Sequence, residues 1–210
     1  MTDIPELEKQ QKKSSRFKNF LWDLFDLFVF TLFVGGLVLF VRFFVVNPFI
    51  VVWQSMEPTF HQNDFIVIDK VTPKLKNNIS RWDVIVFVPQ GEQYPFIKRV
   101  IGLPGENVLI SGGKVYICSQ KEFSSCKELP EPYLGSWVIT KIQCIGTKEQ
   151  NKYYPLGSWY FVMWDNRSHS ADSRCCFGLG CYSGSSREVT NDEILGKVYL
   201  RILPHFDTKF

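Results

Sequence analysis

The chain has 210 residues, and its 24 lysines and arginines nearly balance its 21 aspartates and glutamates, so the formal net charge at pH 7 is only +3. This length suits one domain of ordinary size plus an anchor. The basic residues are not gathered into a stripe, which argues against a nucleic-acid-binding protein.

An apolar run lies near the N-terminus. Residues 27–41 carry no charge, and Phe43 to Val46 extend the run to 20 residues with Arg42 as its one interruption. At about 1.5 Å per residue the run spans roughly 30 Å, the thickness of a hydrocarbon core. A cleaved signal peptide would have a shorter apolar region followed by small residues, and neither is present. We therefore expect a retained transmembrane anchor over residues 21–46.

Basic residues collect in the tail before this run: Lys9, Lys12, Lys13, Arg16 and Lys18. By the positive-inside rule, residues 1–20 form a cytoplasmic tail and residues 47–210 lie outside. The sequence therefore predicts a single-pass protein of the plasma membrane, with the lipid bilayer as one partner and an exported domain on the outer face.

Short segments rich in β-branched and aromatic residues recur through the exported part. They lie at 64–71, 82–88, 96–101, 107–110, 114–117, 159–163 and 196–203. These segments are flanked by Gly, Pro, Asn or Asp, as is typical of strands. No exported window of comparable length has apolar residues at the 3.6-residue spacing of a helix. We predict a mainly β exported domain built on antiparallel sheet. The more polar residues 118–155 are expected to form a β insertion or small subdomain.

All six cysteines lie in the exported part: Cys118, Cys126, Cys144, Cys175, Cys176 and Cys181. An oxidising compartment favours disulfides, and six cysteines allow fifteen full pairings. Cys118 and Cys126 bracket a short polar loop and are the pairing that the sequence favours. Buried free thiols and metal ligation stay open as alternatives, although C-C-x4-C without a nearby histidine is a weak metal signal.

Ser55 lies a few residues beyond the apolar run, in FIVVWQSMEPTF. A serine needs a base to act as a nucleophile, because its hydroxyl is scarcely ionised at neutral pH. The three histidines, His61, His169 and His205, lie in polar contexts or in the C-terminal tail, which indicates surface residues rather than a buried triad histidine.

Lys98 is the other candidate base. It follows Phe96 and Ile97, and alternation along a strand should direct Lys98 and Arg99 to opposite faces. Burial would lower the pKa of the amine from about 10.4 toward ~7 to 8 and leave it able to accept a proton. The alternative from position alone is a lysine that snorkels from a strand edge.

Four further stretches carry a family resemblance. SMEPT at 55–59, RWDVIVF at 81–87, KRVIGLPGE at 98–106 and DNRSHSADSR at 165–174 resemble, in order and at plausible spacings, the successive boxes of bacterial type I signal peptidases. ILGKVYLRILP at 194–204 is similar to the closing segment of that family. The resemblance covers the anchor and most of the exported chain, apart from the expected insertion.

The resemblance implies a membrane-bound serine endopeptidase with a Ser/Lys dyad, which removes N-terminal signal peptides from exported preproteins and needs no cofactor or metal. Ser55 would be the nucleophile, Lys98 the general base, and Ser170 would orient the Lys98 amine. The backbone N–H of Ser55 would donate to the oxyanion, a contribution of about 3 to 4 kcal/mol at comparable sites. Five charged residues would support the site structurally: Arg99, Asp165, Arg167, Asp172 and Arg174.

The implied substrate is an extended segment with small side chains before the cleaved bond, bound along a strand edge. Seven residues of the matching region are expected to face it: Phe49, Ile50, Gln54, Met56, Tyr94, Phe96 and Ile97. Because enzyme and preprotein would share one membrane, their effective concentration would be high.

Three tryptophans depart from the family pattern. Trp53 stands where the family has serine or glycine, the serine side chain completing the oxyanion hole, and Trp82 and Trp164 stand where it has glycine. Glycine serves where the backbone approaches closely or adopts positive φ, whereas an indole buries some 150 to 250 Å². Three accounts remain open: divergence, an inactive homologue, or UGA codons that encode glycine in the host and were translated as tryptophan.

Two functional alternatives also stay open. One is a catalytically impaired homologue that binds exported segments, which Trp53 and Trp164 would favour and the retained Ser55 and Lys98 would not. The other is a Ser/Lys protease that acts on itself or on a dedicated regulator, which the anchor and the outward site make less natural. A preprotein with an altered A-x-A site would separate these alternatives.

Overall fold

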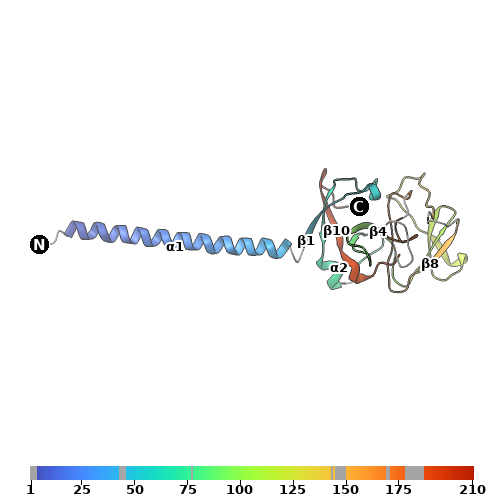
Figure 1. The fold of residues 1–210 in the computed structure, drawn as a ribbon, viewed down its shortest axis with the longest axis horizontal. Helices are drawn as coiled ribbons and strands as arrows, with labels where there is room; N and C mark the ends of the chain where they lie inside the picture. The colour runs from blue at the N-terminus through green and yellow to red at the C-terminus, as the bar shows by residue number, and fades with distance from the viewer. Residues whose placement is uncertain are drawn as a thin grey trace. The chain divides into compact units, whose positions relative to one another are not determined.

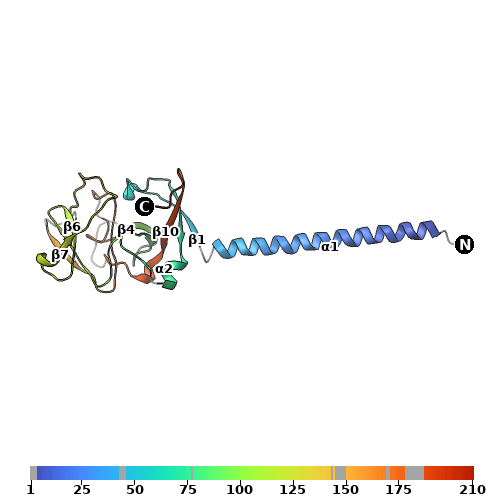
Figure 2. The same ribbon diagram turned by 180° about the vertical axis from the view of Figure 1, so that it is seen from behind.

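The structure is a computed structural model that describes residues 4–42, 46–76, 78–142, 144, 150–168, 171–177 and 187–210. The chain divides into two compact units, Met1–Val45 and Val46–Phe210. Figures 1 and 2 show the two units from opposite sides.

The first unit is built on one helix, α1 (Ile4–Phe40). Its stretch Lys18–Phe40 has 23 residues and a mean hydropathy of 2.1, and none of its side chains is buried within the structure. A helix of this length and composition can cross a bilayer. The predicted apolar N-terminal helix is therefore confirmed. Helix α1 ends at Phe40, whereas the sequence predicted an anchor that continues to residue 46.

The second unit contains a six-stranded sheet in which every neighbouring pair of strands is antiparallel. In spatial order its strands are β1 (Val46–Ile50), β2 (Phe65–Asp69), β10 (Ile194–Leu203), β3 (Val84–Phe87), β4 (Phe96–Gly102) and β9 (Phe161–Met163). The long strand β10 lies between β2 and β3 and so joins the two halves of the sheet (Figure 1). The predicted mainly antiparallel β fold is confirmed.

A second antiparallel sheet has four strands, in the order β7 (Cys126–Glu128), β6 (Lys114–Cys118), β5 (Asn107–Ser111) and β8 (Lys152–Pro155). Figure 2 shows β6 and β7 beside each other at one end of the unit. The expected insertion thus supplies only the two outer strands, and the hairpin that precedes it supplies the central pair.

Short helices complete the second unit: η2 (Gln54–Met56), α2 (Val71–Lys76), η3 (Phe123–Ser125) and η4 (Asn191–Glu193). Of these, η2 carries the predicted nucleophile. It begins after an extended residue, Trp53, whose φ is −120° and ψ 152°. The backbone N–H of Phe60 donates to the carbonyl of Met56 over 2.9 Å, which continues the turn beyond η2.

Strand β4 links the core regions of the two sheets. Val100 packs with Ile85 in one buried cluster, whereas Ile101 packs with Val108 in the cluster that lies against the second sheet. At the end of β4, a Cβ on Gly102 would clash with Val108 and Leu156. The glycine in KRVIGLPGE is therefore required by close packing between the sheets.

Candidate active site

Ser55 lies in η2 and is almost fully buried, with 5% of its surface exposed. Met56 next to it has no exposed surface and packs with Val51 and Phe60. The backbone N–H of Asn166 donates to the carbonyl of Ser55 over 3.1 Å, and the Asn166 side-chain amide donates to the carbonyl of Gln54 over 3.2 Å. The turn at 164–167 therefore holds η2 in place.

Lys98 lies in β4, paired with Ile85 of β3, and is 1% exposed. Its Nζ donates to the carbonyl of Ile97 over 2.9 Å and lies 5.0 Å from the ring centroid of Phe96. Burial lowers the pKa of Lys98 to about 7, and the carboxylate of Asp172 opposes this change. A substantial fraction of the amine is therefore neutral at pH 7 and can accept a proton.

The 164–167 turn contacts both predicted catalytic residues. Its Trp164 ring centroid lies 4.6 Å from the Nζ of Lys98, and its Asn166 binds the backbone of Ser55. The structure thus brings a buried serine and a buried lysine with a lowered pKa to the same turn. Both candidate residues therefore border one structural element.

A buried ion pair fixes one side of this turn. Asp165 accepts hydrogen bonds from Nε and Nη2 of Arg99 over 2.9 and 2.7 Å, and both side chains have no exposed surface. The hydroxyl of Thr59 donates to the same carboxylate over 2.5 Å, and Nη1 of Arg99 donates to the carbonyl of Trp82 over 2.8 Å. Arg99 therefore joins four segments at the site.

A second buried pair fixes the other side. Nη2 of Arg174 donates to Asp172 over 2.8 Å, and Asp172 also accepts the backbone N–H of Trp164 over 3.2 Å. Nη1 of Arg174 donates to the carbonyl of Arg167 over 2.9 Å. Arg99, Asp165, Arg167, Asp172 and Arg174 are all buried, and each is connected to the 164–167 turn, in keeping with the support role proposed for them.

Asp165→Asn is expected to destabilise the second unit by about 3 to 5 kcal/mol, because it leaves the Arg99 guanidinium buried without its counter-charge. The measurement is thermal or denaturant unfolding of the purified protein. Glu128→Gln is the control, since Glu128 pairs with Lys114 on the surface and its loss should leave the unfolding midpoint almost unchanged. Equal midpoints for Asp165→Asn and the parent would contradict the assignment.

Six of the seven residues predicted to face the substrate keep exposed surface: Phe49, Ile50, Gln54, Tyr94, Phe96 and Ile97. Ile50 and Tyr94 are the most open of the apolar ones, with 59% and 75% exposed. The seventh, Met56, is fully buried, and we assign it to the core that supports Ser55.

Two predicted residues lie outside the described part of the chain: Ser170, expected to orient the lysine amine, and His169. The other two histidines, His61 and His205, are exposed. Neither of these two has the buried position that a triad base needs.

The three unexpected tryptophans differ in their surroundings. Trp82 has φ +70°, a left-handed conformation that favours glycine, and Arg99 holds its carbonyl. Trp53 has ordinary extended backbone and is 75% exposed, two residues before the predicted nucleophile. Trp164 covers the amine of Lys98. The backbone thus favours glycine at position 82, whereas Trp164 contacts the Lys98 amine and Trp53 is largely exposed with an unstrained backbone.

Sequence reasoning missed the residues that surround Arg167. Glu131, Tyr133 and Thr140 all contact its guanidinium from the expected insertion. They stand in a polar stretch without a periodic pattern, and the contacts join residues 27 to 36 positions apart. No sequence signal singled them out.

Two disulfides join pairs of cysteines within the described part of the chain, and Cys176 is also disulfide-bonded. One joins Cys118 to Cys126, the pair that the sequence favoured, and the other joins Cys144 to Cys175. The second bond connects the insertion to the residue after Arg174. Among the described residues, no cysteine is free and no group of three potential ligands is placed to hold a metal.

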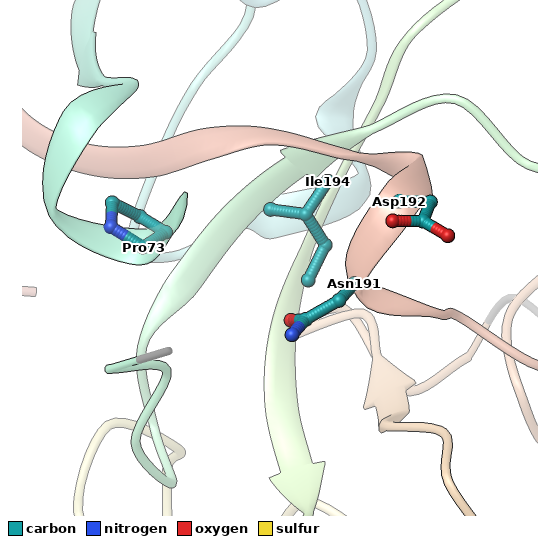
Figure 3. A pocket seen from close by; sticks show the side chains of 4 residues that line it. All are labelled: Pro73, Asn191, Asp192 and Ile194. Carbon is teal, nitrogen blue, oxygen red and sulfur yellow. The ribbon is translucent and has the colours of Figure 1, made fainter. Parts of the chain in front are cut away.

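A pocket elsewhere in the unit is lined by Pro73 of α2, Asn191 and Asp192 of η4, and Ile194 of β10 (Figure 3). In this view the side chain of Ile194 lies between Pro73 and Asp192, with Asn191 below it. None of the predicted site residues lines this pocket, so it does not belong to the Ser55 and Lys98 region.

Comparisons with known proteins agree on one family. Residues 24–203 match the family model described as signal peptidase, peptidase S26. The chain is 30% identical over 172 residues to signal peptidase I of Bacillus licheniformis, covering 80% of this chain and 86% of that protein. It is 30% identical to signal peptidase I U of Bacillus subtilis (strain 168), covering 81% and 83%.

Among solved structures, a signal peptidase I from Enterococcus faecalis V583 matches with a TM-score of 0.38 and 23% sequence identity. The match covers 57% of this chain and 96% of that chain.

Proposed function

Since the chain belongs to the signal peptidase family, peptidase S26, we propose that this serine endopeptidase cleaves N-terminal signal peptides from exported preproteins with a Ser55 and Lys98 dyad. The observation that carries the dyad is the burial of Lys98, which lowers its pKa to about 7 beside the turn that also binds Ser55. A lysine with an ordinary pKa of about 10.4 would be protonated and could not act as a base.

In the proposed reaction, neutral Lys98 accepts the proton of the Ser55 hydroxyl as the Oγ attacks the carbonyl carbon of the cleaved bond. The backbone N–H of Ser55 donates to the oxyanion. The Lys98 ammonium then gives its proton to the leaving amine, and an acyl group stays on Ser55. Water, deprotonated by Lys98, hydrolyses this ester and restores both groups. Ser170 keeps its proposed role of orienting the amine.

We place the reaction at the outer face of the plasma membrane. The apolar stretch Lys18–Phe40 of helix α1 supplies the proposed anchor, and by the positive-inside rule the basic residues in the first half of α1 favour a cytoplasmic N-terminus. The substrate segment would bind in extended form along exposed Ile50 and Tyr94, with small side chains before the cleaved bond.

The full-length protein in detergent is expected to cleave a preprotein with an A-x-A site. Its kcat/KM should rise with pH through about 7, because the neutral amine of Lys98 is the working form. At one pH unit below that pKa, about a tenth of the plateau value should remain. Initial rates from pH 5 to 9, measured at substrate concentrations well below KM, check this profile.

A preprotein whose A-x-A residues are replaced by bulky ones is the control, and it should stay uncut. Cleavage of both substrates alike, or of the enzyme alone, would instead support a protease that acts on itself or a regulator. A kcat/KM that is flat between pH 6 and 8 would contradict Lys98 as the base.

A second candidate is a homologue that binds exported segments without cleaving them. The observation that favours it is the contact between the Trp164 ring and the amine of Lys98, together with the indole of Trp53 beside Ser55. This candidate predicts binding of a signal peptide with no cleavage at any pH.

A further inference from the structure

The guanidinium of Arg167, in the 164–167 turn, has hydrogen-bond acceptors on all three of its nitrogens. Arg167 is 2% exposed, and its Nε donates to the carbonyl of Trp164 over 2.7 Å. This bond closes the turn that contacts Lys98 through Trp164 and Ser55 through Asn166. Arg167 is therefore hydrogen-bonded to the backbone of the turn that makes both contacts.

The other end of Arg167 is held from the insertion. Nη1 donates to Glu131 over 3.0 Å and to the hydroxyl of Thr140 over 2.9 Å. Nη2 donates to Glu131 over 2.5 Å and to the hydroxyl of Tyr133 over 3.0 Å. These four bonds and the one at Nε use all five N–H donors of a guanidinium. We call Glu131, Tyr133 and Thr140 the Arg167 clamp.

Tyr133 also connects the clamp to strand β4. Its ring centroid lies 4.0 Å from Cζ of Arg99, the residue after Lys98, and 6.0 Å from Cζ of Arg167. Its hydroxyl donates to Glu131 over 2.6 Å, and burial raises the pKa of Tyr133 above its usual range, so the hydroxyl keeps its proton. One neutral aromatic ring thus lies beside two of the three buried guanidinium groups of the site, those of Arg99 and Arg167.

We propose that Glu131 and Tyr133 are positioning residues of the active site, which hold the 164–167 turn against Ser55 and Lys98 through Arg167. The proposal rests on the proposed function, and it gives residues 131–140 a task in catalysis. A charge-assisted bidentate bond fixes both the distance and the plane of Arg167, which a single hydrogen bond would not do.

Glu131→Gln is the first test, because it keeps the shape of the side chain and removes the carboxylate. The turn should loosen and admit water to Lys98. The kcat for a preprotein is then expected to fall by about 10- to 100-fold, while KM changes little because the exposed substrate-facing residues are untouched. Glu128→Gln, which changes an exposed pair of the same region, should keep the parental kcat.

The pKa of Lys98 gives a readout that does not depend on activity. The rate of Lys98 acetylation by acetic anhydride is measured against pH by mass spectrometry. Asp172, the charged group that acts on Lys98, is retained, so better hydration in Glu131→Gln should raise the pKa of the amine by about one unit. Glu128→Gln should leave it unchanged.

Tyr133→Phe is the second variant, because it removes one hydroxyl and keeps the ring on Arg99. Like Glu131→Gln, it should lower kcat and raise the pKa of Lys98, but by smaller amounts. If Glu131→Gln does not fold, Tyr133→Phe tests the positioning role in its place. A folded variant with the parental kcat and the parental Lys98 pKa overturns the proposal. If the parent cuts no preprotein but the Lys98 pKa still rises in the variants, the positioning role stands and the proposed function fails.

Discussion

Ser55→Ala is expected to lower preprotein cleavage by about 10⁴- to 10⁶-fold, to the level left by the remaining site, because no other group can form the acyl intermediate. Lys98→Met should cause a loss of the same order, since Ser55 would then keep its proton. The double variant should be no worse than either single one, because the two residues would act as a unit. Single-turnover assays with a labelled preprotein measure all three.

The stability of Lys98→Met distinguishes loss of chemistry from loss of fold. Lys98 has a pKa of about 7 when folded against an ordinary 10.5, so between these values the unfolded chain binds more protons and stability rises with pH. Below pH 7 the buried amine costs about 4 to 5 kcal/mol, which methionine removes. The variant should therefore unfold at higher temperature than the parent at pH 7. Full cleavage by either single variant would refute the dyad.

Richness in β-branched and aromatic residues, together with flanking Gly, Pro, Asn or Asp, predicted most strands of the six-stranded sheet. The predicted segments 64–71, 82–88, 96–101 and 196–203 contain or overlap β2, β3, β4 and β10. Strand β1 was missed because VNPFI continues the apolar run of the anchor and contains a proline. Strands β7 and β8 were missed because they are short and polar. They form strands because they pair with β6 and β5, and their local sequence pattern does not indicate this.

The sequence predicted the candidate site only at residues whose side chains are themselves reactive or charged. Position alone left Lys98 either buried or snorkelling from a strand edge, the family resemblance favoured the buried base, and in the structure Lys98 is buried. Arg99 was expected on the opposite face, and it is buried too, because both faces of β4 are covered and Asp165 neutralises its charge. The contacts of Glu131 and Tyr133 with Arg167 could not be predicted, since they pair side chains from distant loops whose meeting depends on the two sheets.

Trp82 is the position where the structure bears most directly on the recoding hypothesis. A non-glycine residue at φ +70° costs about 1 to 2 kcal/mol, and a large aromatic residue there is unusual. Trp164 lies against the amine of Lys98, whereas Trp53 is exposed two residues before Ser55. Trp159 differs from all three, because it is buried in the core and its ring centroid lies 6.3 Å from that of Phe161.

If UGA encodes glycine in the host, native protein isolated from that host should contain glycine at 53, 82 and 164. Peptide mass spectrometry decides this, with the Trp159 peptide as the control that keeps its indole.

The form with all three tryptophans can be made in a host that reads UGA as tryptophan, or from recoded genes. This form should then gain activity on Trp164→Gly, which uncovers the Lys98 amine, and on Trp53→Gly. We expect kcat/KM of the triple glycine variant to exceed that of the tryptophan form by about 100-fold, since misplacement of catalytic groups by an ångström has effects of that size. Trp82→Gly alone should raise stability rather than kcat, because its ring is not at the reacting groups and its backbone is strained. Tryptophan at position 53 in the native peptide would end the recoding hypothesis, and an unchanged kcat/KM in the triple variant would show that the indoles do not obstruct the site.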